Sequence, residues 1–225
     1  MRSTRAAVDP GSRPLDHEHS MANRAYLIGS SNADTAGPGE MGINYNPDTE
    51  ILAGASTQIP VFWLSLFDES HIKPHVVQEC RIPAPVCEAS AGRAIMEQRR
   101  ARILTAFSQC ETHWEAWQRL ITEAPFPFFK LDGTEVWLLD PELFESQLPA
   151  AIRWFSSGAD DDFAKLLSIA EIPSPAPRGL LGRLVGGTQP GYDPTTKTFT
   201  PGPNDSRGHH LHGYSWVRDV PWKDE

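Results

Sequence analysis

The sequence lacks the long apolar run that a membrane span requires. About 18 consecutive apolar residues are needed to cross a bilayer, and no segment comes near that length although 40% of the 225 residues are hydrophobic. Residues 1–20, MRSTRAAVDPGSRPLDHEHS, carry arginines but no apolar core, which a secretory signal would need. We expect a soluble protein without a membrane partner, in which residues 1–20 are a flexible leader and Met21 opens the folded region.

Cysteine is also scarce. Cys80, Cys87 and Cys110 are odd in number, and their spacing matches neither a disulfide framework nor the C-x-x-C pair of a zinc site. A reducing compartment is the simplest interpretation, so we expect a cytoplasmic protein.

Positive charge is in deficit. The chain has 20 lysines and arginines against 29 acidic residues, which gives a net charge of -9. Nucleic-acid binding depends on lysine and arginine displacing counterions from phosphates, so this balance disfavours a nucleic-acid partner. A protein partner with a basic surface fits the charge better.

Signatures of known reactions are missing as well. There is no G-x-S-x-G serine elbow, no phosphate-binding G-x-x-x-x-G-K and no dinucleotide-binding G-x-G-x-x-G, and no cofactor is predicted. The remaining candidate for chemistry is GHHLHGYSW, which contains His209, His210 and His212. We interpret these histidines as a polar, pH-sensitive loop between glycines. The alternative is a metal-dependent hydrolase that uses all three, with His71 or His75 as further ligands.

Two helices are predicted in the middle of the chain. Residues 93–107 place their apolar side chains on one arc at the helical period, and Arg99 and Arg100 fall within that arc. We interpret both arginines as stems lying along apolar surface or paired with a core carboxylate, and the alternative is an anion clamp. Thr112 and Glu115 form a T-x-x-E capping box that predicts the start of the second helix.

Two further helices follow. Asp140 and Pro141 are typical of an N-cap and a first helical position, Leu143 opens the predicted buried face, and Gly158 suits the left-handed end of a helix. Another helix begins near Asp161.

The acidic run Asp160, Asp161 and Asp162 stands at the start of this last helix, where the helix dipole favours carboxylates. A calcium loop would need alternating ligands, a glycine and a distal glutamate, which this run does not have. We interpret the three aspartates as an exposed, charged part of a partner-binding surface and predict no metal here.

Strands are predicted on both sides of the helices. Ala25–Ile28 is a short strand, and residues 59–67, IPVFWLSLF, form a strand buried on both faces or else a core helix. The dipeptide Asp132-Gly133 predicts a tight hairpin. Residues 214–220 alternate like a closing strand. The predicted fold is therefore α+β, with a mainly antiparallel sheet packed by three or four helices.

The composition divides the chain in two after the helices. Residues 21–172 form the predicted α+β domain, and residues 173–225 are a Pro- and Gly-rich irregular segment whose final strand packs on the same domain. Loops of this length are uncommon unless they bind something or wrap a surface.

The opening MANRAYLIGSS, together with IPVFWLSLF about thirty residues later, resembles a group of small uncharacterised bacterial proteins that begin MANR-x-YL. Some of that group are associated with toxin or effector and immunity gene pairs. The resemblance covers the first third of the folded region and carries no catalytic residue. It implies an acidic cytoplasmic protein that binds a toxin and blocks it by occlusion, so we expect a binding protein rather than an enzyme.

Overall fold

Part of the chain is described by the computed structural model. The described residues are 23–34, 49–77, 79–173, 191–202 and 206–214. The predicted leader at residues 1–20, the opening at Met21 and all but the first residue of the closing strand lie outside them.

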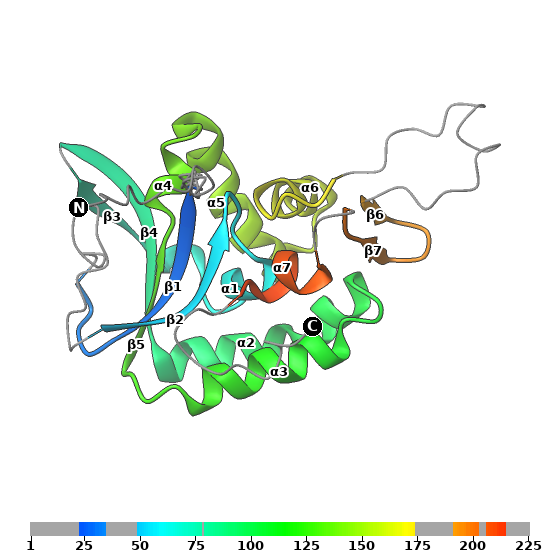
Figure 1. The fold of residues 1–225 in the computed structure, drawn as a ribbon, viewed down its shortest axis with the longest axis horizontal. Helices are drawn as coiled ribbons and strands as arrows, with labels where there is room; N and C mark the ends of the chain where they lie inside the picture. Colours follow the sequence, from blue (N-terminus) through cyan, green and yellow to red (C-terminus); the bar gives the residue numbers. More distant parts are fainter. Residues whose placement is uncertain (1–22, 35–48, 78, 174–190, 203–205, 215–225) are drawn as a thin grey trace, which may run out of the picture.

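Five antiparallel strands form the main sheet, in the order β2-β1-β5-β4-β3 (Figure 1). Every neighbouring pair is antiparallel, which confirms the predicted α+β class. The strands are β1 (Arg24–Ser30), β2 (Thr49–Ser56), β3 (Ile72–Val77), β4 (Cys80–Glu88) and β5 (Phe128–Asp132).

Alternate side chains of the sheet face two different environments. On β1, Leu27 belongs to the main core with the helices, whereas Ile28 belongs to a small second cluster. Because side chains alternate along a strand, the residue paired with Ile28 on β5 also faces away from the main core. That residue is Lys130, which is paired on its other side with Val86 of β4.

The helices pack beside this sheet, with α1 and α7 between the α2–α3 pair and the α5–α6 pair (Figure 1). The helices are α1 (Val61–Leu64), the 3-10 turn η1 (Glu69–His71), α2 (Ala89–Ala106), α3 (Glu111–Glu123), α4 (Thr134–Trp137), α5 (Pro141–Ser157), α6 (Asp160–Ile169) and α7 (Arg207–His212). No helix among the described residues has the length and apolar character of a membrane span.

Residues 59–67 are core, as expected, but the predicted strand is wrong and the helical alternative is correct. Pro60 is the N-cap of the short helix α1 (Val61–Leu64), in which all four residues have no exposed surface. A short, wholly apolar run has no periodicity that could distinguish the two structures.

Of the two helix-capping predictions, the one for α5 is confirmed and the one for α3 is wrong. Asp140 Oδ1 accepts a hydrogen bond from the Leu143 amide at 3.0 Å, and Gly158 ends α5 with φ 67°, as predicted. The Thr112–Glu115 capping box is wrong, because α3 begins at Glu111 after Cys110 and has no side-chain cap.

The predicted hairpin at Asp132-Gly133 is also wrong. Gly133 has φ -111°, not the positive angle of a type I′ turn. Asp132 Oδ1 instead accepts a hydrogen bond from the Thr134 amide at 3.0 Å, and α4 follows at once. The α+β class does not depend on this turn, since the adjacent antiparallel pairs are β1–β2 and β3–β4.

The proline-rich stretch from Ile72 to Glu88 contains two paired antiparallel strands, β3 and β4. The segment after residue 173 also contains a two-stranded ribbon, β6 (Gly191–Asp193) and β7 (Thr198–Thr200). Tyr214 forms a backbone bridge to Gly54 at the outer edge of β2.

Candidate functional site

The C-terminal histidines lie on a helix and not in a loop. The Ser206 hydroxyl accepts a hydrogen bond from the His209 amide at 3.3 Å and caps α7, which contacts α1 and α3. Successive side chains on a helix point about 100° apart, so His209 and His210 diverge.

His210 ties three elements together. It is 4% exposed, its Nδ1 donates to the Ala170 carbonyl at 2.9 Å at the end of α6, and its ring meets Phe199 of β7 edge to face at 5.0 Å between centroids. This side chain has the contacts of a buried structural histidine.

His212 is 2% exposed and forms a pair with His113 of α3. Its Nδ1 lies 2.8 Å from the Gly213 carbonyl, which can only accept, so Nδ1 carries the proton and Nε2 is the acceptor. His113 Nδ1, 3.1 Å away, therefore donates to Nε2. Burial lowers the pKa of His212 to about 3, so this imidazole is neutral at neutral pH. The sequence did not connect these residues, which are 99 positions apart.

The further ligands that the metal hypothesis named are elsewhere. His71 Nδ1 accepts a hydrogen bond from the Asp68 amide at 3.0 Å, and His75 is on β3 at the far edge of the sheet from β2. Among the described residues, no three His, Cys, Asp or Glu side chains are grouped so as to hold a metal ion.

The buried thiols are poor nucleophiles. Burial raises the pKa values of Cys87 and Cys110 to about 12, so the reactive thiolate is scarce at neutral pH.

The aspartate run does not form the uniform exposed surface that was expected. Asp160 and Asp161 are exposed, but Asp162 is 7% exposed. Asp162 accepts two hydrogen bonds from Arg153 and one from the Ser157 hydroxyl. Its charge is therefore neutralised within the chain, and only the first two aspartates could meet a partner.

A different surface combines exposed apolar side chains with charge. Leu138, Leu139 and Leu143 are 61%, 54% and 45% exposed at the junction of α4 and α5. The exposed carboxylates in the same stretch belong to Asp140, Glu142 and Glu145. We call these six residues the leucine corner.

A buried tryptophan supports the leucine corner. Trp137 of α4 is 9% exposed, and its indole N–H donates to Glu145 Oε1 of α5 at 3.0 Å. Together with the Asp140 cap, this bond fixes the two helices relative to each other. The corner is a preorganised surface, which lowers the cost of ordering it on binding.

Sequence reasoning missed this surface and placed Leu143 on the buried face of its helix, which is wrong. One signal was present: from Leu131 to Ile152 the chain has five carboxylates and no lysine or arginine. Burial of the leucines could not be judged from their type, since single leucines occur on both faces of many helices.

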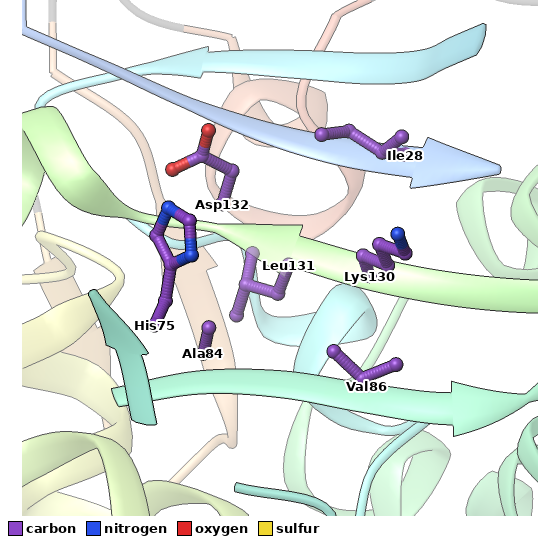
Figure 2. A pocket seen from close by; sticks show the side chains of 7 residues that line it. All are labelled: Ile28, His75, Ala84, Val86, Lys130, Leu131 and Asp132. Atoms are coloured by element: carbon purple, nitrogen blue, oxygen red, sulfur yellow. The ribbon is translucent and has the colours of Figure 1, made fainter. Parts of the chain in front are cut away.

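The second face of the sheet has a small hollow (Figure 2). Ile28 of β1 and Val86 of β4 flank Lys130 of β5, and His75 and Asp132 line the other end. The volume is about 10 Å³, which is roughly the space of a single water molecule.

Lys130 is 4% exposed, and burial lowers its pKa. Its Nζ donates to the amide oxygen of Asn32 at 3.0 Å. Strand periodicity would predict a solvated lysine on the face opposite Phe129 and Leu131, so the burial of Lys130 could not be predicted from the local pattern.

In comparisons with known proteins, no family model, no curated protein and no solved structure matches the chain.

Proposed function

We propose that this chain is a protein-binding module whose leucine corner docks on a partner with a basic surface. The observation that carries the proposal is the set of three exposed leucines framed by carboxylates, in a stretch without a basic residue. Exposed leucines scattered singly are ordinary on a protein surface, whereas exposed apolar side chains that lie together mark a candidate interaction site.

The two kinds of side chain have different roles. Leu138, Leu139 and Leu143 supply the apolar area that gains free energy when an apolar cleft of the partner covers it. Asp140, Glu142 and Glu145 form a charged rim that attracts a basic surface and speeds association. Net charge adds to this steering, since the whole chain carries -9.

The resemblance of the opening to MANR-x-YL proteins suggests who the partner is. We propose that the partner is a bacterial toxin or effector and that this chain is its immunity protein. In the cytoplasm, the chain would neutralise the toxin by covering a basic active-site surface. The metal-dependent hydrolase that uses His209, His210 and His212 remains the alternative proposal, but no three His, Cys, Asp or Glu side chains of the described residues are grouped so as to hold a metal ion.

Co-expression with the product of the neighbouring reading frame tests the proposal. The wild-type chain should restore growth, and calorimetry with the purified pair should give a saturable complex. Replacing Leu138, Leu139 and Leu143 with serine should weaken binding by at least about tenfold, or about 1.4 kcal/mol. Val76→Ser is the matched control, because Val76 is 63% exposed on β3.

A second pair of variants tests the charged rim. Glu142→Gln with Glu145→Gln should slow association at low salt more than at high salt, because salt screens exposed charges. Glu115→Gln with Glu123→Gln removes the same charge from exposed positions of α3 and should have a smaller effect. If the serine variant still restored full growth, the leucine corner would be ruled out as the docking surface. Asp160→Asn with Asp161→Asn would then test the other exposed acidic site.

A further inference from the structure

The exposed large apolar side chains of the described residues lie in two places. They are Val76, Leu138, Leu139 and Leu143. The three leucines belong to the leucine corner, whereas Val76 is on β3 and is the most exposed of the four, at 63%. An exposed apolar side chain marks a contact site only when its surroundings fit a partner, so the neighbours of Val76 decide what it can bind.

Val76 stands on a ribbon that extends beyond its pairing with the rest of the sheet. β3 pairs with β4 from Ile72 to Val77, but β4 pairs with β5 only from Val86 to Glu88. The outer part of the β3–β4 ribbon therefore has no described strand on its β4 side. Figure 1 shows the ribbon at the edge of the sheet, on the side away from α6 and α7. This position allows a second molecule to reach it.

One face of the ribbon combines apolar side chains with a cation. Val76 is directly paired with Arg81 of β4, and Pro74 is paired with Pro83, so these four side chains point to the same face. Pro74 and Arg81 are exposed, and Pro83 is partly buried. Arg81 belongs to no described ion pair. We call these four residues the arm patch.

The arm and the leucine corner carry opposite charge. From residue 72 to residue 85 the chain has Lys73 and Arg81 against a single carboxylate, Glu79. The leucine corner has three exposed carboxylates, and none of them belongs to a described ion pair. The arm patch thus offers a guanidinium beside apolar surface, and the leucine corner offers carboxylates beside apolar surface. Such surfaces attract each other.

We propose that the leucine corner of one copy of this chain docks on the arm patch of a second copy. Because the two surfaces differ, the contact joins the copies head to tail. A contact between two leucine corners is disfavoured, since it would bring three carboxylates against three others. The proposal rests on the leucine corner as a docking surface, as the proposed function does, and adds that a second copy competes with the partner for it.

The strength of the contact follows from its size. One valine, two prolines and one arginine on the arm meet three leucines on the corner, which is far less than the roughly 1,600 Å² buried in a standard stable interface. We therefore expect weak, reversible self-association. Salt should weaken it further, because the charges on both surfaces are exposed and are screened.

Sedimentation of the wild-type full chain over a range of concentrations tests the self-association. The average mass should rise with concentration at low salt and fall toward the monomer mass when salt is added. Val76→Ser with Arg81→Gln should weaken the association at least about fivefold, and the serine variant of the leucine corner should do the same. Arg119→Gln removes the same charge at an exposed position of α3 and is the matched control.

Mixing the two defective variants distinguishes a contact between unlike surfaces from a contact between like ones. The serine variant of the leucine corner retains its arm patch, and the arm variant retains its leucine corner. Each should be monomeric alone. The mixture should form a dimer that grows no further, because one intact contact joins the two chains and neither has a surface left for a third.

Methyl NMR of the wild-type chain removes any dependence on the folding of variants. The signals of Val76 and of the three leucines should move together as the concentration rises, while those of the fully buried Val61 should stay in place. Movement of the leucine signals without that of Val76 would indicate a corner-to-corner contact and would contradict the arm patch.

Two further results would overturn the proposal: a wild-type chain that stays monomeric at every concentration, or a mixture of the two variants that does not associate. Either result would leave the proposed function standing, because these measurements contain no partner. Loss of partner binding in the serine variant, with Val76→Ser unaffected, would still support docking of a partner on the leucine corner.

Discussion

Arg153 holds Asp162 in a two-pronged ion pair, with Nε 3.0 Å from Oδ2 and Nη2 2.7 Å from Oδ1. The arginine is on α5 and the aspartate is in the first turn of α6, so the pair fixes the angle between consecutive helices. Arg153 also reaches Glu69 of η1 at 3.0 Å. A run of three aspartates thus contains one structural residue and two surface residues.

Asp162→Asn should lower the melting temperature by a few degrees, while Asp161→Asn should leave it nearly unchanged. The Arg153 hydrogen bonds hold the pKa of Asp162 below its usual value. Their stabilisation is therefore complete above the unfolded-state pKa of about 3.9 and is lost as the pH falls through the lower folded-state pKa. Melting curves of both variants across this range check the sign, and a difference that grows in acid would contradict it.

Arg99 and Arg100 offer a matched pair for the second prediction. Arg99 is 6% exposed and donates to the Ser65 and Phe67 carbonyls at 3.1 and 2.6 Å, as well as to Asp68. Arg99→Ala should cost about 3 kcal/mol, because it leaves these acceptors without their donor. Arg100→Ala breaks an exposed pair with Glu111 and should cost less than about 1 kcal/mol. Urea unfolding midpoints of the two variants measure both stability losses. Similar losses for Arg99→Ala and Arg100→Ala would contradict a structural role that only Arg99 has.

Local signals in the sequence predicted the ends of α5 but not the start of α3, where the Thr112–Glu115 capping box was wrong. Asp140, Pro141 and Gly158 determine the ends of α5 through contacts within a few residues, so that helix was predicted well. The position of β5 between β1 and β4 depends on strands far away in the chain, and no local pattern encodes it. The hairpin prediction at Asp132-Gly133 was wrong because Gly133 packs closely against Phe144 of α5, and the dipeptide alone does not show this contact.

The candidate sites depend even more on distant contacts. Lys130 meets Asn32 across 98 positions, and His113 meets His212 across 99. Neither contact could be predicted from the spacing of residues along the chain. The leucine corner is local, but whether its leucines are exposed is decided by how α4 and α5 pack.

Gly133 supports a third prediction. A Cβ atom at this position would lie 2.8 Å from Cζ of Phe144 and 3.4 Å from Cδ1 of Ile59. Gly133→Ala should therefore cost about 1–3 kcal/mol by overpacking the core. Phe144→Leu shortens the obstructing side chain, so the alanine substitution should cost less in that background. A double-mutant cycle in urea measures the coupling, and additive losses would show that the contact with Phe144 does not limit the position.

The fourth prediction concerns acid stability and His212. Its pKa is about 3 in the folded chain because of burial, with smaller contributions from His113 and His209, against an ordinary value of 6.5. Below about pH 6.5 the unfolded chain binds a proton here that the folded chain does not. The free energy of unfolding should thus fall by about 1.4 kcal/mol per pH unit from this group alone.

His212→Gln removes that proton and should flatten the acid side of the stability profile. The free energy of unfolding of the variant, measured in urea from neutral pH downward, should fall less steeply than that of the wild-type chain, and the two should run parallel above about pH 6.5. His75→Gln, on the far side of the sheet, is the control and should keep the wild-type slope. Equal slopes for wild type and His212→Gln in acid would mean that His212 can take up a proton without unfolding. The imidazole pair with His113 would then be a proton-accepting site and not a sealed structural contact.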